Sequence, residues 1–287
     1  MAELDTLVED VYRLFDPSIE HTVDEDNIEA FGETVKEIMR TRLRARVDRG
    51  NGLRFSALGR PNRQVWYDAH PIEGGKEEML AKTYVKFAYG DLIEAFLLFL
   101  VKEAGHSVEK EQAEVEVDGV KGHIDAIIDG VVVDVKSASP FGYKKFANRT
   151  ITEDDPFGYV HQLAGYASVL TPGQDAAWLA MDKVSGDICI SPLSATVIKY
   201  HQPGERIAEL KSVIASDTPP DFCYDPVADG KSGNMKLPTP CSYCSHKFRC
   251  HPGVRMFAYS TGPRYLTQVV KVPDVPEISE GMFIAEE

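Results

Sequence analysis

Long apolar runs are missing from this 287-residue chain. No stretch approaches the roughly 18 apolar residues that a membrane-spanning helix needs. Residues 1–30 are acidic, unlike a signal peptide. The expected location is therefore the cytoplasm, or the host cytoplasm if a phage encodes the chain. Internal repeats and low-complexity tracts are missing too, and hydrophobic and charged contents of 43% and 26% are typical of a globular protein.

Basic residues are outnumbered by acidic ones, 31 to 45, so the net charge is −14. This balance argues against a general nucleic-acid coat protein, but an enzyme acting on nucleic acid needs only a local basic surface. Between Lys36 and Arg63, nine basic residues stand against two acidic ones, a net charge of +7. This segment is either a solvated helix end or a surface that contacts phosphates. Its candidate DNA contacts are Arg42, Arg44, Arg46, Arg60 and Arg63.

Cysteines are few and odd in number, five in all, which does not suggest a disulfide framework. Three of them form the pattern Cys241-x-x-Cys244-x₅-Cys250, and this spacing indicates a bound metal. The fourth ligand we expect is Cys223, with His246 and His251 as competitors. Cys189 lies in an expected strand and is interpreted as a small buried hydrophobe.

The most informative segment is Gly122–Lys136. Asp129-Gly130 is a strong signal for a two-residue β-hairpin turn. With that turn, Asp125 lies opposite Asp134, and two opposed carboxylates among apolar neighbours repel. A divalent cation between them would remove the conflict. Lys136 is two residues past Asp134 and shares its strand face.

The periodicity predicts helices over residues 3–48, 77–104, 157–170 and 203–215. Strands are expected at 107–117, 120–128, 131–137, 176–182 and 187–192, with a loop at 139–155 that carries Lys144, Lys145 and Arg149. The expected regions are an N-terminal helical region (1–50), a core (51–222), a cysteine-rich metal-binding segment (223–262) and an acidic tail (263–287).

Two further helices carry polar candidates. Glu94 lies on a mostly apolar helix, where a carboxylate is costly unless it is paired or binds a cation; the alternative is a helix-edge residue that reaches solvent. Gln162 and Tyr166 are four residues apart and share a helix face.

The order of these elements resembles the PD-(D/E)XK nuclease superfamily, within its branch of RecB-type, CRISPR-adaptation and phage exonucleases. The resemblance covers about residues 85–200, and the cysteine region more loosely. The matching elements are Gly90-x-x-x-Glu94, Gly122-His123-Ile124-Asp125, Asp134-Val135-Lys136 and Gln162-Leu163-Ala164-Gly165-Tyr166. It implies an α/β (α+β) fold, with a central mixed sheet flanked by helices and the acids at one sheet edge.

The resemblance also implies roles. Asp125, Asp134 and Glu94 would coordinate Mg²⁺ or Mn²⁺, which prefer oxygen ligands, and the Val135 carbonyl would be a further ligand. Lys136 would orient or deprotonate the attacking water, while Gln162 and Tyr166 position the phosphate or the lysine. His123, expected opposite Lys136, is either a DNA contact or a packed strand residue.

Relatives with an iron–sulfur cluster have a similar C-terminal cysteine triplet, so a 4Fe–4S cluster is expected, with Zn²⁺ as the alternative. Those relatives usually carry a further cysteine upstream of the Gly-x-x-x-Glu helix. Here no cysteine precedes position 189, and Asn62 stands about where one would be sought.

The function expected from the resemblance is a Mg²⁺- or Mn²⁺-dependent exonuclease acting at single- or double-stranded DNA ends in phage replication, recombination or repair. A CRISPR-adaptation nuclease that trims ends, a restriction endonuclease and a non-catalytic DNA-binding subunit are the alternatives. Beyond DNA, the partners considered are a second copy of the chain or a recombination or replication protein.

Overall fold

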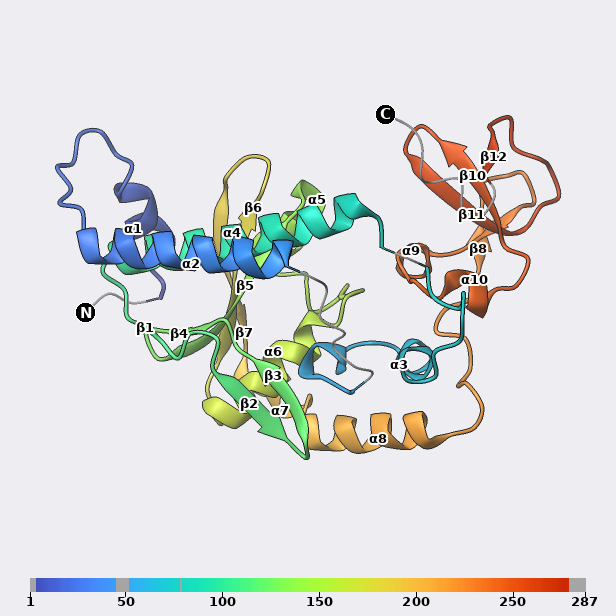
Figure 1. The fold of residues 1–287 in the computed structure, drawn as a ribbon, viewed down its shortest axis with the longest axis horizontal. Helices are drawn as coiled ribbons and strands as arrows, with labels where there is room; N and C mark the ends of the chain where they lie inside the picture. Colours follow the sequence, from blue (N-terminus) through green and yellow to red (C-terminus); the bar gives the residue numbers. More distant parts are fainter. Residues whose placement is uncertain (1–3, 45–51, 78, 279–287) are drawn as a thin grey trace. The chain divides into compact units, whose positions relative to one another are not determined.

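The computed structural model describes residues 4–44, 52–77 and 79–278. The chain divides into two compact units, each built from two stretches of sequence (Figure 1). The first unit comprises Met1–Gly59 and Met79–Glu209, and the second comprises Arg60–Glu78 and Leu210–Glu287. In the described residues, no helix is long and apolar enough to cross a membrane.

A mixed sheet of five strands forms the centre of the first unit. Its order is β1-β4-β5-β6-β7, and only β5 and β6 pair in parallel. A parallel pair needs a long crossover, and α5 and α6 occupy the connection between these two strands. The strands are β1 (Val108–Glu109), β4 (Ala126–Ile128), β5 (Val131–Ala138), β6 (Ala176–Asp182) and β7 (Ile188–Leu193).

The β4–β5 hairpin has the predicted register. Ala126 pairs with Val133 and Ile128 with Val131. Asp129 (φ 50°) and Gly130 (φ 83°) both have the positive φ that a type I′ turn requires. Asp125 therefore directly precedes the strand, one position beyond the last ladder pair.

The predicted continuous strand over residues 120–128 is wrong, because the chain leaves the central sheet at Ile124 and Asp125. Strands β2 (Glu114–Val117) and β3 (Val120–His123) form a separate hairpin around Asp118-Gly119. His123 consequently pairs with Glu114, not with Lys136. Its side chain is exposed, so the packed-strand interpretation of His123 is also wrong.

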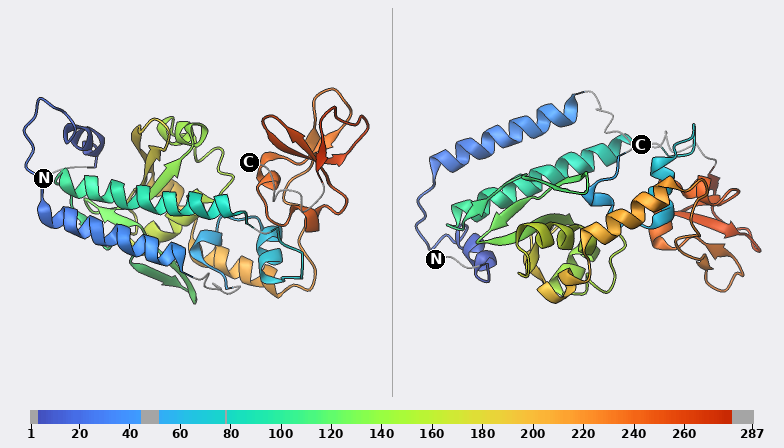
Figure 2. Two further views of the ribbon diagram at one scale, coloured as in Figure 1. Left: turned by 45° about the horizontal axis from the view of Figure 1, so that its top comes forward. Right: turned by 90° about the horizontal axis from the view of Figure 1, so that it is seen from below.

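One face of the central sheet is covered by α1 (Leu7–Arg13) and α4 (Ala81–Glu103), which share a core with Val133, Val135 and Leu179. Helix α4 contributes the buried residues Ile93, Leu97, Leu98, Leu100 and Val101, and none before Ile93. Helix α2 (Glu25–Leu43) runs beside α4 in both views of Figure 2 and contributes no buried residue. Asp24 caps its N-terminus by accepting from the Asp26 and Asn27 amides.

The opposite face, which carries Asp134 and Trp178, meets α5 (Pro140–Ala147) and α6 (Tyr159–Leu170). Helix α5 corrects the predicted loop at 139–155. Ser139 caps it by accepting from the Gly142 amide at 3.2 Å, and Pro140 suits the first turn. The remaining elements attributed at least in part to this unit are the 3₁₀ turn η1 (Phe55–Ala57), α7 (Ala195–Lys199) and the start of α8 (Pro203–Ala215).

The second unit contains an antiparallel sheet of five strands where the sequence predicted mainly loops. Its order is β12-β10-β11-β9-β8. The strands are β8 (Val227–Ala228), β9 (Met235–Lys236), β10 (Arg255–Tyr259), β11 (Gly262–Gln268) and β12 (Glu277–Ile278). Short helices α3 (Asn62–Ala69), α9 (Thr239–Ser242) and α10 (Lys247–Cys250) accompany the sheet. Its small core is Leu237, Met256 and Tyr265.

Candidate active site

Asp125, Asp134 and Lys136 meet at one end of the β4–β5 hairpin. Asp134 is buried, with 5% of its side chain exposed, and its Oδ2 lies 2.5 Å from Lys136 Nζ. Asp125 Oδ2 accepts a hydrogen bond from the Val135 amide at 2.6 Å. This bond ties the loop before β4 to the middle of β5, so the hairpin itself fixes the spacing of the two acids.

Glu94, on α4, is electrostatically coupled to the same acids. Burial, followed by the charges of Asp125 and Asp134, raises the Glu94 pKa to about 8. Burial and the Asp134 charge raise the pKa of Asp125 to about 7. Three carboxyl groups sharing a poorly solvated region cannot all ionise without a compensating charge. The repulsion inferred from the sequence is thus a property of the folded site.

Lys136 supplies part of that compensating charge. Burial alone would lower its pKa, but the charges of Asp134 and Asp125 outweigh burial and raise it. The Tyr159 ring centre lies 4.9 Å from Lys136 Nζ, a cation–π contact. Tyr159 was not singled out from the sequence. The available signal was its position three residues before Gln162, which puts both on one side of α6.

Tyr166 packs near the site, within electrostatic reach of Asp134 and Asp125. It is buried and stacks on Phe55 with ring centres 5.0 Å apart. Burial raises its pKa to about 12, although a hydrogen bond with Gln162 opposes the rise. A Cβ on Gly122 would lie 2.7 Å from the Tyr166 hydroxyl, so glycine is needed where β3 passes this ring.

The donor set of the site fits a hard divalent cation, because carboxylate oxygens are the ligands that Mg²⁺ and Mn²⁺ prefer. Oδ2 of Asp134 is buried, and no hydrogen-bond donor of a described residue other than Lys136 reaches it. In the described part of the chain, however, no three His, Cys, Asp or Glu side chains are grouped closely enough to hold a metal. A cation would therefore require Glu94, Asp125 and Asp134 to turn toward one another.

The predicted DNA contacts are dispersed. Arg42 forms a bidentate pair with Asp91 at 2.5 and 2.6 Å, while Arg44 is exposed. Lys145 pairs with Asp154 at 2.6 Å, and Lys144 and Arg149 are exposed. Arg60 and Arg63 belong to the second unit: Arg60 pairs with Asp68 at 3.2 Å, and Arg63 donates to the Pro220 carbonyl. Arg46 lies outside the described residues.

The thiols of Cys223, Cys241, Cys244 and Cys250 influence one another electrostatically in the second unit, but in the described part of the chain no three of them are grouped closely enough to hold a metal. Burial and the nearby thiols of Cys223, Cys244 and Cys250 raise the pKa of Cys241 to about 12. Burial also raises the pKa values of Cys223 and Cys244. Of the competing ligands, His246 Nε2 lies 3.0 Å from an Asp68 oxygen, and His251 stacks on Phe222. Asn62 begins α3 in the same unit, and Cys189 lies apart in β7.

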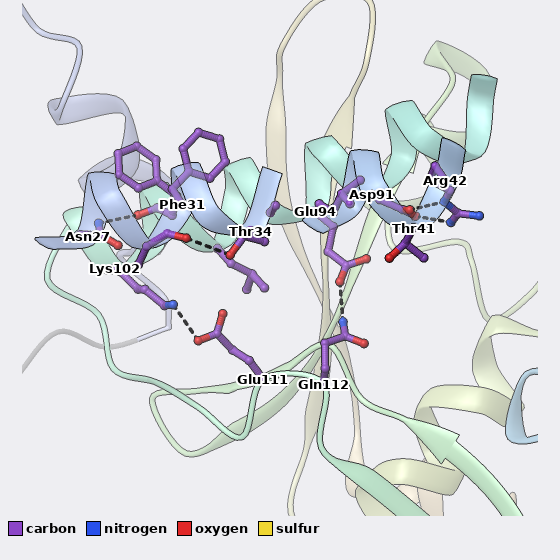
Figure 3. Close-up of a pocket in the computed structure, with 15 residues that line it drawn as sticks. Asn27, Phe31, Thr34, Thr41, Arg42, Asp91, Glu94, Lys102, Glu111 and Gln112 are labelled. Atoms are coloured by element: carbon purple, nitrogen blue, oxygen red, sulfur yellow. Dashed lines mark hydrogen bonds and ion pairs between the residues drawn. The ribbon is translucent and has the colours of Figure 1, made fainter. Parts of the chain in front are cut away.

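A pocket of about 380 Å³ lies between α2, α4 and the link from β1 to β2 (Figure 3). Glu94 forms part of its wall and accepts from Gln112 Nε2 at 2.7 Å. Gln112 also contacts the site through its backbone, because its backbone N–H donates to the Asp125 carbonyl at 3.2 Å. The pocket therefore adjoins the carboxylate cluster. No sequence pattern marks this pocket, since its lining comes from three separate segments.

No family model and no curated protein matches the chain. Solved structures show a weak likeness. The crystal structure of SSO0001 aligns with a TM-score of 0.39 at 16% identity, over 76% of this chain and 93% of its own. The alkaline exonuclease LHK-Exo from Laribacter hongkongensis aligns with a TM-score of 0.38 at 14% identity, over 62% of this chain and 94% of its own. The structure of LHK-Exo in complex with dAMP aligns with a TM-score of 0.35 at 13% identity, over 63% of this chain and 89% of its own.

Proposed function

We propose that this chain is a Mg²⁺- or Mn²⁺-dependent deoxyribonuclease that hydrolyses phosphodiester bonds at DNA ends. The observation that carries the proposal is the electrostatic cluster of Glu94, Asp125, Asp134 and Lys136, in which two carboxyl pKa values are strongly raised. Strongly perturbed acids beside a lysine favour catalysis over a purely structural role. The intact set also disfavours the alternative of a non-catalytic DNA-binding subunit.

Asp125, Asp134, Glu94 and the Val135 carbonyl would hold the cation. When bound, it would polarise the phosphoryl oxygen and lower the pKa of a water molecule. Lys136 stays protonated because the adjacent acids raise its pKa. It therefore orients the attacking water and offsets negative charge on the phosphate. The Tyr159 ring contacts the ammonium, and Gln162 and Tyr166 fix the helix that carries Tyr159.

Within this proposal, the four neighbouring cysteines would bind a 4Fe–4S cluster or, alternatively, Zn²⁺. Thiolates are the ligands that both prefer. The role is structural: the bound metal would join α9, α10 and the segment around Cys223 within the second unit. Burial and then the three neighbouring thiols raise the pKa of Cys241, and a bound metal would oppose both effects by stabilising the thiolate.

The test is digestion of linear and circular DNA, labelled at the 5′ or 3′ end, with Mg²⁺ or Mn²⁺. Loss of label from linear DNA, with circular DNA intact, is the expected result. Cleavage of circles would indicate an endonuclease, and trimming to a fixed length would favour the CRISPR-adaptation alternative. Binding without cleavage in either metal would refute the enzyme and leave the DNA-binding subunit.

A further inference from the structure

The pocket beside Glu94 has the size of a small-molecule site. Its volume of about 380 Å³ falls within the range of ligand pockets, roughly 300–1,000 Å³. The lining combines one side of α2, the C-terminal half of α4 and the residues just after β1 (Figure 3). It explains why α2, a helix of 19 residues packed beside α4, contributes no buried side chain.

The charges of the lining disfavour a phosphate. It contains two cations, Arg42 and Lys102, and three carboxylates, Asp91, Glu94 and Glu111. Arg42 is engaged by Asp91 through two hydrogen bonds, and Lys102 pairs with Glu111 at 2.6 Å. Both positive charges are already paired with carboxylates, so these described residues leave no unpaired cation for an anionic group. A neutral ligand fits better.

The remaining lining suits a flat, partly polar molecule. Phe31 and Phe99 stack with ring centres 4.9 Å apart, beside Leu98. Gln112 donates to Glu94, and Asn27 donates to the Phe99 carbonyl and to Glu103. Both N–H groups of the Asn27 amide and one of the Gln112 amide are engaged, and the two amide oxygens supply hydrogen-bond acceptors at the lining. Aromatic surface with acceptors at the edge is what a nucleobase with amino or imino N–H groups requires.

We propose that this pocket receives the base of the nucleotide that is being removed, while its phosphate lies at the carboxylate cluster. This inference rests on the proposed function, because Glu94 belongs to both places. Gln112 couples them further, through its side chain to Glu94 and its backbone to Asp125. An occupied pocket would thus position Glu94 in the same step that positions the scissile phosphate.

The test compares two linear substrates that are identical except at the end nucleotide, which carries either its base or an abasic tetrahydrofuran. The end chosen is the one that the unmodified protein degrades. Base stacking is worth about 1–3 kcal/mol per base, so we expect the abasic end to be removed more slowly by roughly five-fold to 150-fold. Phe31→Ala should slow removal of the normal nucleotide and bring the two rates close together.

Two further variants sharpen the result. Ala30→Phe fills the pocket without deleting a stacked ring, and should also reduce the preference for a base if the fold is retained by circular dichroism. Phe15→Ala, at a ring that is 63% exposed and outside the lining, is the control and should keep the full preference. Equal rates on both substrates in the unmodified protein, or an undiminished preference in both pocket variants, would overturn the inference alone. No cleavage of any end would overturn the proposed function and the inference together.

Discussion

Asp134 is the residue on which the catalytic proposal depends most directly. It is buried, carries the ion pair with Lys136 and acts electrostatically on Glu94 and Asp125. Asp134→Ala should lower the cleavage rate by two to three orders of magnitude or more, the scale of losing one key electrostatic group. Release of end label measures the rate, and circular dichroism checks the fold. Asp5→Asn, at an exposed acid, is the control. An Asp134→Ala protein that cuts at the unmodified rate would refute the site.

Tyr159 tests whether the position of Lys136 matters. Tyr159→Phe keeps the ring on the ammonium and should retain activity, whereas Tyr159→Leu removes the cation–π contact of 4.9 Å. A contact worth about 0.5–2 kcal/mol corresponds to a loss of roughly two- to thirty-fold in kcat, with KM for DNA little changed. Tyr200→Leu, at a side chain 80% exposed, is the control. Equal activity of the Phe and Leu variants would show that the ring does not position the lysine.

At the scale of elements, hydrogen bonds to Glu103 connect the start of α2 to the end of α4. Its carboxylate accepts from His21 at 2.9 Å, the Asp24 amide at 3.0 Å and Asn27 at 2.8 Å. Burial would raise its pKa, but these hydrogen bonds outweigh burial and lower it from 4.5. A carboxyl whose pKa is lower in the folded state stabilises the fold at pH values above its unfolded-state pKa. This stabilisation is lost as the pH falls through the folded-state pKa.

Glu103→Gln should therefore destabilise the protein by about 2 kcal/mol at pH 7, the scale of a hydrogen bond to a charged group. The difference from the unmodified protein should shrink as the pH is lowered below 4.5. Urea unfolding at several pH values measures both, with Glu20→Gln, at an exposed acid, as the control. If the two proteins differ in free energy of unfolding by the same amount at every pH, the ionised form of Glu103 does not connect the two helices.

Elements governed by local chemistry were the predictable ones. The β4–β5 register followed from Asp129-Gly130, and α6 and the β6–β7 hairpin followed from apolar patterning between turn residues. Helix α5 was missed although Ser139-Pro140 is a start signal, because no strong apolar periodicity follows it. Strands β8, β9 and β12 have two residues each, too few for a local pattern, and β9 and β12 also pair with strands about 20 to 30 residues away. The contact of Lys136 with Tyr159 likewise depends on how α6 packs.

At the scale of the whole molecule, the cysteines and the carboxylates belong to different units, so their metals should be separable. Anaerobically prepared protein should absorb near 400 nm if the site holds an iron–sulfur cluster (about that wavelength for thiolate-ligated clusters), or be colourless with bound zinc. Cys223→Ser should lose metal as severely as Cys244→Ser, because a four-coordinate site tolerates no missing ligand. Cys189→Ser, in the first unit, is the control. Freshly prepared protein with neither iron nor zinc would refute the site.

The second unit is assembled from two stretches that the ribosome makes at different times. Trp66 donates to the Ser216 carbonyl and Asp68 pairs with His246, so the earlier stretch depends on the later one. Residues 79–209 are translated in between, which takes roughly 7–26 s at about 5–20 residues per second. During that interval Trp66 and Tyr67 have no partners from the later stretch. The nascent first unit must therefore fold around an unfinished insertion, and the proposed cysteine site is complete only once Cys250 has been made.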